Sequence, residues 1–145
     1  LAVRGDELRA AGRSIVLANG AFDMLHVGHL RYLEGAAATG DFLVVAVNSD
    51  ASVRRAKGET RPIVPEAERA ELVAGLSAPD AVLIFSSDTV EPVIAALRPN
   101  VHAKGTDYTA ESVPEGDLVR SLGGEVRIVG DPKDHSTTEM IGKLR

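Results

Sequence analysis

Residues 14–48 read SIVLANGAFDMLHVGHLRYLEGAAATGDFLVVAVN, and this stretch decides the fold class. The β-branched run at 14–18 and the longer apolar run at 42–48 are typical of strands that are buried on both faces. Between them, apolar residues recur at helical spacing from Val27 until the pattern stops at Gly40, which predicts a helix. A strand, a helix and a strand in this order predict two parallel strands joined by a helical crossover.

The same alternation continues to the end of the chain. We predict further strands at 81–85, 100–105 and 125–129, and further helices at 65–76, 88–97, 115–124 and 136–145. Residues 51–64 form the least regular region, which is rich in charge and interrupted by Gly58 and Pro62. Regular alternation predicts a Rossmann-like, doubly wound α/β fold: a mainly parallel five-stranded sheet with helices on both faces.

Length and composition narrow the class of protein. The 145 residues fit one domain, so we expect a single domain over residues 1–145, although a start at Leu1 rather than Met leaves a preceding domain open. The chain has no cysteine, which excludes disulfides, thiolate metal sites and a cysteine nucleophile. No segment has the ~18 apolar residues of a membrane span, and no signal peptide is evident. We therefore expect a cytoplasmic protein without a membrane partner.

The charge and the aromatic content disfavour a nucleic-acid partner. The formal net charge is −5, which is the wrong sign for a protein that binds a phosphate backbone. With no Trp, two Tyr and three Phe, the chain also lacks an evident base-stacking platform. Any binding of phosphate must therefore be local.

Four segments follow predicted strand ends, where ligands of an open parallel sheet bind. They are residues 19–29, 48–62, 104–108 and 130–138. The first strand is not followed by GxGxxG, and GxxxxGK[ST] is absent, which excludes the dinucleotide fingerprint and the P-loop. The first segment instead has Gly28 at the start of a helix, where free N–H groups and close backbone approach suit an anion.

Two histidines flank this glycine. His26 and His29 can donate from a ring nitrogen to phosphate oxygens without the permanent charge of lysine, and the helix dipole favours an anion at the same place. A helix cap plus a surface residue is the structural alternative for such a pair alone. The match is longer than the pair, however. The pattern GxFDxxHxGH is completed by Gly20, Phe22, Asp23, His26, Gly28 and His29.

In this pattern the chain resembles the HxGH nucleotidyltransferase superfamily, and further segments are similar to its cytidylyltransferase-like branch. These segments are VAVNSD at 45–50, KG at 57–58, RP at 61–62, ER at 68–69, KG at 104–105, DY at 107–108 and STT at 136–138. Within the branch, the likeness is greatest to the adenylyltransferases of ADP-heptose synthesis, which act on D-glycero-β-D-manno-heptose 1-phosphate. The likeness runs from about residue 14 to residue 145.

The resemblance implies a reaction and a set of site residues. AMP would move from ATP to a sugar 1-phosphate, giving an ADP-sugar and pyrophosphate for lipopolysaccharide or other surface polysaccharide precursors. Mg²⁺ would enter with ATP, and the protein would be a homodimer. The implied catalytic residues are His26, His29 and Lys57. The implied nucleotide-binding residues are Asn19, Gly20, Ala21, Phe22, His26, Gly28, His29, Lys104, Gly105, Asp107, Ser136, Thr137 and Thr138. The implied substrate-binding residues are Asp23, Asn48, Asp50, Lys57, Arg61 and Arg69, and no residue is expected to be a metal ligand.

Several of these residues have a structural alternative. A single lysine is most often solvated, but Lys57 comes after the second predicted strand and Lys104 lies where the fourth predicted strand ends. Asp23 is either a turn residue or a support for His29 or for a magnesium-bound water. Arg69 either pairs with a glutamate of its own helix or contacts phosphate or a second subunit.

The end of the chain separates two readings of the nucleotide. Residues 136–139, STTE, fit a capping box as well as a phosphate contact. Residues 131–138, DPKDHSTT, depart from the RTxGISTT pattern of glycerol 3-phosphate cytidylyltransferases because the arginine is absent. Lys133 and His135 have open roles there, and His102 is more typical of a packed strand residue than of a ligand.

Two other functions stay open at this point. One is a cytidylyltransferase that acts on glycerol 3-phosphate or a similar alcohol phosphate, and the other is a nucleotide-binding module without catalysis. The sequence also leaves open the exact sugar and anomer, the choice of ATP over CTP, and a kinase domain before Leu1.

Overall fold

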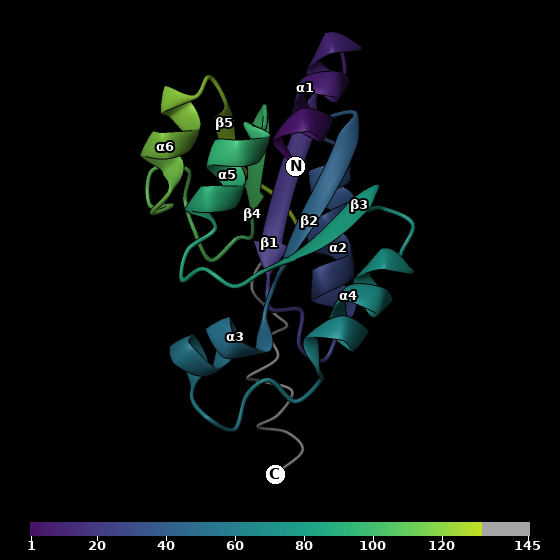
Figure 1. The fold of residues 1–145 in the computed structure, drawn as a ribbon, viewed down its shortest axis with the longest axis vertical. Helices are drawn as coiled ribbons and strands as arrows, with labels where there is room; N and C mark the ends of the chain where they lie inside the picture. Colours follow the sequence, from purple (N-terminus) through teal and green to yellow (C-terminus); the bar gives the residue numbers. More distant parts are fainter. Residues whose placement is uncertain (132–145) are drawn as a thin grey trace.

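A computed structural model describes residues 1–131 and is built on a five-stranded parallel sheet (Figure 1). The strands are β1 (Ile15–Gly20), β2 (Phe42–Asn48), β3 (Ala81–Phe85), β4 (Val101–Lys104) and β5 (Glu125–Ile128). Their order in the sheet is β3-β2-β1-β4-β5, and every neighbouring pair is parallel. The prediction of a doubly wound, Rossmann-like fold is therefore confirmed.

The two central strands are apolar throughout because they contribute to two cores at once. In β1, Ile15 and Leu17 pack into one core, whereas Val16 and Ala18 pack into the other. β2 alternates between the same two cores. Burial on both faces removes the apolar and polar alternation that a half-exposed strand would show.

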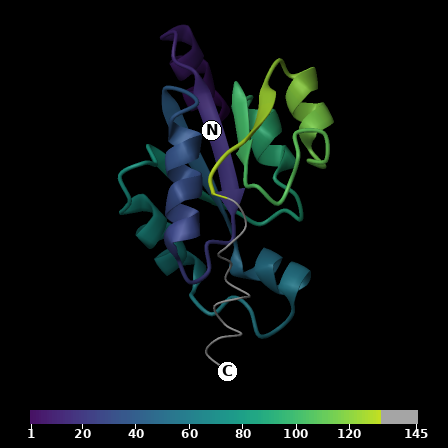
Figure 2. The ribbon, with the colours of Figure 1, turned by 180° about the vertical axis from the view of Figure 1, so that it is seen from behind.

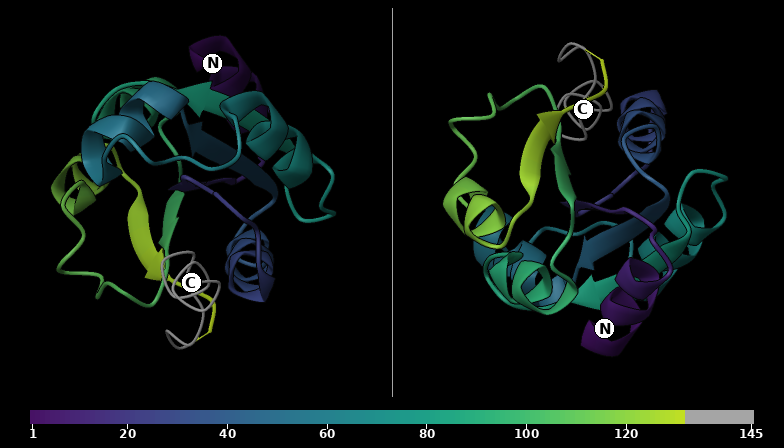
Figure 3. Two further views of the ribbon diagram at one scale, coloured as in Figure 1. Left: turned by 90° about the horizontal axis from the view of Figure 1, so that it is seen from below. Right: turned by 90° about the horizontal axis from the view of Figure 1, so that it is seen from above.

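Helices cover both faces of the sheet, as the view from behind and the views from below and above show (Figures 2 and 3). On one face lie α1 (Ala2–Ala10), α5 (Glu91–Leu97) and α6 (Gly116–Ser121), and on the other lie α2 (Val27–Ala37) and α4 (Glu66–Ala74). The first group buries side chains such as Leu8 and Ile94, and the second buries Leu33 and Val73. Within residues 1–131, no helix combines the length and the apolarity that crossing a bilayer requires.

Two helices differ from the sequence prediction. α1 was not predicted, and α3 (Asp50–Lys57) occupies half of the region regarded as least regular. Both are short and largely polar, so apolar periodicity gives little signal for either. The start of α3 is capped locally, since the Ser49 hydroxyl accepts from the Ser52 N–H at 3.1 Å. The predicted helix at 136–145 lies outside the described residues.

The sheet opens between β1 and β4, where the strand order reverses. β1 pairs with β2 along its whole length, from Ile15 to Gly20. With β4 it pairs at two positions, of which the second is Leu17 with His102. The two strands therefore separate toward their carboxyl ends, which is where open α/β sheets bind ligands. α3 lies beyond this end of the sheet (Figure 1).

Candidate active site

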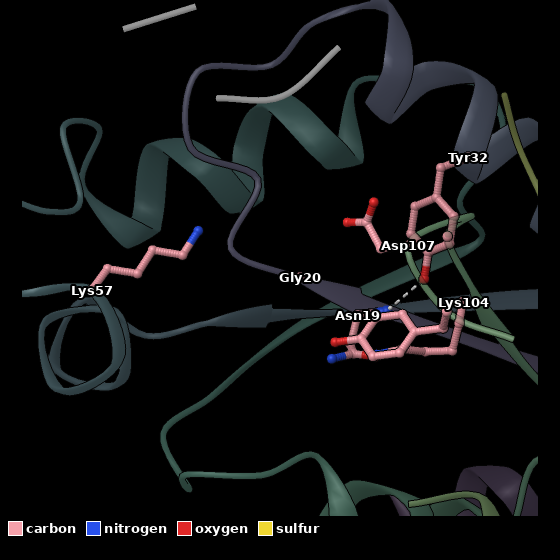
Figure 4. Close-up of a pocket in the computed structure, with 8 residues that line it drawn as sticks. Asn19, Gly20, Tyr32, Lys57, Lys104 and Asp107 are labelled. Carbon is pink, nitrogen blue, oxygen red and sulfur yellow. Dashed lines mark hydrogen bonds between the residues drawn. The ribbon is translucent and has the colours of Figure 1, made fainter. Parts of the chain in front are cut away.

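A pocket of about 370 Å³ lies where β1 and β4 separate (Figure 4). Its walls come from the ends of both strands, from α2, from the last residue of α3 and from the loop after β4. The lining residues are Asn19, Gly20, Tyr32, Lys57, Lys104, Gly105, Asp107 and Tyr108. Pockets of roughly 300–1,000 Å³ take small molecules, so the size and the position both suit such a ligand.

Tyr32 of α2 holds the opening between the two strands. Its hydroxyl accepts from the Asn19 N–H of β1 at 3.3 Å and donates to the Ala103 carbonyl of β4 at 2.6 Å. The hydroxyl thus satisfies one backbone group on each strand where the strands no longer pair with each other. Burial raises the pKa of the Tyr32 phenol, so the hydroxyl keeps the proton that it donates. Sequence analysis did not select Tyr32, whose helical spacing indicates only a packed residue.

The loop from β1 to α2 is fixed to the core by its aromatic residue. Phe22 was expected among the nucleotide-binding residues, but its side chain is buried in the core between the sheet and α2. Its backbone has a positive φ of 52°, which turns the chain toward the helix. The ring of Phe22 also lies 5.5 Å from that of His29, between centroids. The side chain of Phe22 therefore supports the loop, and only its main chain is left for contact with a nucleotide.

His26 and His29 cap the start of α2 reciprocally. The Nδ1 atom of His26 accepts from the Gly28 N–H, and the Nδ1 atom of His29 accepts from the His26 N–H, both at 3.1 Å. The two rings lie 4.0 Å apart between centroids. An Nδ1 that accepts carries no proton, so the proton of each neutral ring is on Nε2. Both histidines thus take part in the cap and neither is an exposed surface residue, and the arrangement makes Nε2 of each ring a hydrogen-bond donor.

The surroundings keep His29 neutral. Burial, followed by the electrostatic effects of the neighbouring His26 and Lys57, lowers the pKa of His29 to about 4, although Asp23 opposes this shift. These two histidines do not line the pocket themselves, but Lys57 does, and its charge acts on His29. At neutral pH, the helix start therefore presents an uncharged N–H donor beside the pocket.

Asp23 joins the loop between β1 and α2 to the segment that follows α3. Its carboxylate accepts from the Ile63 and Val64 N–H groups, both at 2.9 Å, and from Nε of Arg61 at 3.1 Å. Burial alone would raise the pKa of Asp23, but these hydrogen bonds and the charge of Arg61 outweigh it and lower the pKa. Asp23 and Arg61 were expected to bind substrate. The structure instead pairs them with each other, with their side chains 1% and 12% exposed.

The two predicted lysines reach the pocket from opposite sides (Figure 4). Lys57 ends α3, and its pKa is lowered by partial burial and by the nearby charge of Arg61. Lys104 ends β4, where its ammonium lies 4.8 Å from the centre of the Tyr108 ring. Two lysines that are 47 residues apart in sequence thus line the same pocket, and cations of this kind can neutralise phosphates.

Arg69 is not placed as predicted. Its side chain is fully buried and donates from Nε to the Val64 carbonyl at 2.8 Å, from Nη1 to the carbonyls of Ala21 and Asn48, and from Nη2 to the Asp50 carboxylate at 2.8 Å. It has no exposed surface from which to contact a substrate or a second subunit. Arg69 instead ties the ends of β1 and β2 to the start of α3.

Asn48 and Asp50 make hydrogen bonds at the start of α3. The amide of Asn48 donates to the Ser52 hydroxyl at 3.3 Å, and the Asp50 carboxylate accepts from Arg69. Neither residue lines the pocket. In the structure both residues make contacts that build the start of α3, and their substrate contacts stay a prediction. The predicted residues Ser136, Thr137 and Thr138, together with Lys133 and His135, lie outside the described residues.

His102 behaves as the strand pattern predicts. It is fully buried, and its Nε2 lies 2.8 Å from Oε1 of Glu115, the residue before α6. Sequence analysis missed Glu115, because an acidic residue at a helix start gives no sign of a buried partner 13 residues away.

Few carboxylates of the described residues are placed near the pocket to hold a metal ion. Within residues 1–131, no group of three or more His, Asp or Glu residues is placed to hold a metal by itself. Asp107 is the carboxylate residue among those that line the pocket. Mg²⁺ in such sites usually keeps several waters and binds one or two carboxylates together with substrate phosphates. The donor set of the pocket agrees with that mode of binding.

Comparisons with known proteins show what the chain is similar to. Residues 17–141 match the family described as cytidylyltransferase-like. The bifunctional protein HldE of Pelobacter propionicus is 49% identical over 144 residues, which cover 99% of this chain and 30% of that protein. HldE of Geobacter metallireducens is 51% identical over 136 residues, or 94% of this chain and 28% of that protein. The chain thus spans somewhat less than a third of the length of these relatives.

A solved structure is similar over most of the chain. It is a lipopolysaccharide core biosynthesis protein from Thermoplasma volcanium, with a TM-score of 0.68 and 31% sequence identity. The match covers 81% of this chain and 94% of that chain. The likeness therefore extends to both sequence and fold.

Proposed function

Because the chain belongs to the cytidylyltransferase-like family, we propose that it transfers AMP from ATP to a heptose 1-phosphate, giving ADP-heptose and pyrophosphate. The role in lipopolysaccharide precursor synthesis is supported by the similarity to a lipopolysaccharide core biosynthesis protein and to the HldE proteins. The RTxGISTT pattern of glycerol 3-phosphate cytidylyltransferases has an arginine before STT. This chain lacks that arginine, which disfavours the cytidylyl alternative.

The observation that carries this proposal is the reciprocal histidine cap beside a pocket with two lysines. Both Nδ1 atoms accept from the backbone of α2, so Nε2 of each ring is the donor toward a ligand. A phosphoryl group at this helix start would also meet the free N–H groups and the positive end of the helix dipole. Such preformed donors stabilise charge that grows in a transition state without needing to reorganise.

The proposed reaction needs no covalent intermediate. An oxygen of the sugar phosphate forms a bond to the α-phosphorus of ATP, while the bond from that phosphorus to the β-phosphate oxygen breaks in line. The bonding pair leaves with pyrophosphate. Because the attacking oxygen is already anionic, the site has no need of a strong general base, and positioning and charge stabilisation supply the catalysis.

Each residue has a defined part in this proposal. His26 and His29 donate to the α-phosphoryl oxygens, and Lys57 orients the acceptor phosphate. Lys104, on the other side of the pocket, neutralises the phosphates of the nucleotide. Mg²⁺ would enter with the nucleotide and reduce the charge of its phosphates, and Asp107 is the carboxylate residue that lines the pocket.

A homodimer in the cytoplasm is part of the same proposal. Support for self-association comes from two exposed apolar side chains, Leu72 on α4 and Ile84 on the edge strand β3, which are 52% and 41% exposed. Light scattering after size exclusion tests the dimer, and a monomer at micromolar concentration would contradict it.

An acceptor panel tests the reaction. Pyrophosphate release is measured with ATP or CTP against both anomers of heptose 1-phosphate, glycerol 3-phosphate and a mononucleotide. The proposal expects release with ATP and a heptose 1-phosphate, and little release with CTP. Tight binding of ATP without release from any acceptor would instead support a binding module, and preference for CTP with glycerol 3-phosphate would support a cytidylyltransferase.

A further inference from the structure

A buried carboxylate lies behind the wall of the pocket. Glu115 is 8% exposed and is not among the residues that line the pocket. Its Oε1 atom lies 2.8 Å from Nε2 of His102 and 3.3 Å from Nζ of Lys104. His102 and Lys104 are two residues apart in β4, so both side chains point to the same face of the sheet, which α6 covers. One carboxylate oxygen thus contacts the buried histidine and the pocket lysine together.

The ammonium of Lys104 is held from two sides. The Glu115 carboxylate contacts it from behind the wall, and the face of the Tyr108 ring lies 4.8 Å away. The side chain is only 12% exposed, although lysine is usually solvated. An ammonium has three donor positions, so these two contacts leave one for a group inside the pocket.

We propose that Glu115 is a positioning residue, which fixes the ammonium of Lys104 so that it meets the phosphates of the bound nucleotide. This inference rests on the proposed function, because it takes a nucleoside triphosphate as the ligand of the pocket. The carboxylate does not touch the ligand itself.

The fixed geometry has a physical benefit. A lysine side chain has four rotatable bonds, and holding it costs conformational entropy when a ligand must order it. Glu115 and Tyr108 order the ammonium before the ligand arrives. The carboxylate is suited to this because it stays charged: burial raises its pKa, but the hydrogen bond from His102 and the charges of Lys104 and His102 lower it to about 2.

A carboxylate near a phosphate site also repels the phosphates, so Glu115 has two opposing effects on the affinity for the nucleotide. Lys104 lines the pocket and Glu115 does not, which places the ammonium between the carboxylate and a bound anion. The anion therefore meets the cation at contact distance and the carboxylate only from farther away. We expect positioning to outweigh repulsion, and removal of the carboxylate to weaken binding.

Glu115→Gln tests this with little change in shape. The amide oxygen can still accept from His102, whereas Lys104 loses its anionic partner. We expect the Kd for ATP and for inorganic tripolyphosphate, measured by calorimetry, to rise about tenfold, the effect of losing one well-placed charged contact. The KM for ATP should rise in parallel, with kcat changed less than about twofold, because the contact is made in the ground state and the transition state alike.

The matched control is Asp117→Asn, two residues along the chain. Asp117 is an exposed carboxylate that pairs with Arg120 at 3.1 Å, so its removal changes the net charge equally but leaves Lys104 untouched. It should leave the Kd and the KM unchanged. Glu115→Asp, which keeps the charge but withdraws it by one methylene, should weaken ATP binding to an intermediate degree. Glu115→Asp serves as the second variant if thermal melting shows that Glu115→Gln does not fold.

A double variant shows whether the effect passes through Lys104. In a Lys104→Met background, Glu115→Gln should have no further effect on the Kd for ATP. Additive losses would overturn the inference, and so would ATP binding by folded Glu115→Gln that is as tight as, or tighter than, wild type. Failure of the wild-type protein to bind ATP would instead contradict the proposed function, so the two failures are distinguishable.

Discussion

At the scale of single residues, the candidate site combines structural and chemical roles in the same atoms. His26 and His29 use one ring nitrogen to cap α2 and keep the other as a donor. The cap orients each ring and fixes its tautomer, much as the partners of metal-bound or catalytic histidines do. The two readings of the histidine pair that the sequence left open are therefore parts of one arrangement.

His29→Ala distinguishes the capping role of His29 from its proposed catalytic role, because the two losses differ in magnitude. Loss of the cap should cost roughly 1 kcal/mol of unfolding free energy, as for other helix caps. Loss of a transition-state donor should lower kcat about 10²- to 10³-fold. Thermal melting and pyrophosphate release measure the two effects. Normal turnover in the folded variant would remove His29 from the proposed mechanism.

Arg69, unlike His29, has a structural role without a chemical one, because its guanidinium is wholly inside the protein. Arg69→Met should leave three carbonyls and the Asp50 carboxylate without their donor, at a cost of about 3–5 kcal/mol in denaturant unfolding. Arg55→Met on α3 is the control, because Arg55 is exposed in its pair with Asp88 and should change stability by less than about 0.5 kcal/mol. Unaltered stability of Arg69→Met, with a raised KM for the acceptor, would restore the expected substrate contact.

At the scale of elements, the site depends on the separation of β1 from β4. Parallel strands that paired to their ends would leave no room between Asn19 and Lys104. The α2 helix contributes the hydroxyl of Tyr32, which bridges β1 and β4 just beyond their last paired residues. The element that carries the histidine pair at its first residues thus also sets the width of the pocket.

Tyr32→Phe tests this link between the strands. Without the hydroxyl, the Asn19 N–H and the Ala103 carbonyl lose a buried partner, which should cost about 1–3 kcal/mol. The Asn19 amide should exchange its hydrogen faster, as measured by NMR, and the change should be confined to the ends of β1 and β4. Tyr108→Phe, at a more exposed position, is the control. Unchanged protection of Asn19 in Tyr32→Phe would contradict the role given to Tyr32.

Local patterns made some of these features predictable and not others. The strands and the histidine pair follow from residues close together in sequence, such as His26, Gly28 and His29. The roles of Tyr32, Glu115 and Arg69 arise from contacts with residues up to 71 positions away, which apolar periodicity does not report. The burial of Arg69 was missed for this reason: a charged residue near a strand end is used to join elements.

At the scale of the whole molecule, charge is distributed unevenly. The chain has a net charge of −5, yet its pocket is lined by two lysines and one aspartate. An acidic surface with a locally basic pocket suits a small anionic ligand and not a long polyanion. The expectation that nucleic acid is not a partner and the proposal of a phosphate ligand therefore have the same electrostatic basis.

The buried titratable groups predict how stability depends on pH. His29 has its pKa lowered from 6.5 to about 4 in the folded protein, so the unfolded chain binds more protons between these values. Unfolding free energy should therefore fall as the pH is lowered from about 6.5 to about 4. Denaturant titrations across this range check the slope, and His29→Gln should flatten it. An equal slope in that variant would assign the dependence to another group.

The pocket draws its lining from positions 19 to 108, so the unfolded chain has no counterpart of it. A ligand held there binds the native state alone and shifts the unfolding equilibrium by mass action. At one hundred times its Kd, it would add about 2.7 kcal/mol to the unfolding free energy. Metabolite supply and protein lifetime are thereby coupled: the concentration of nucleotide around the molecule would set how often it opens to proteolysis.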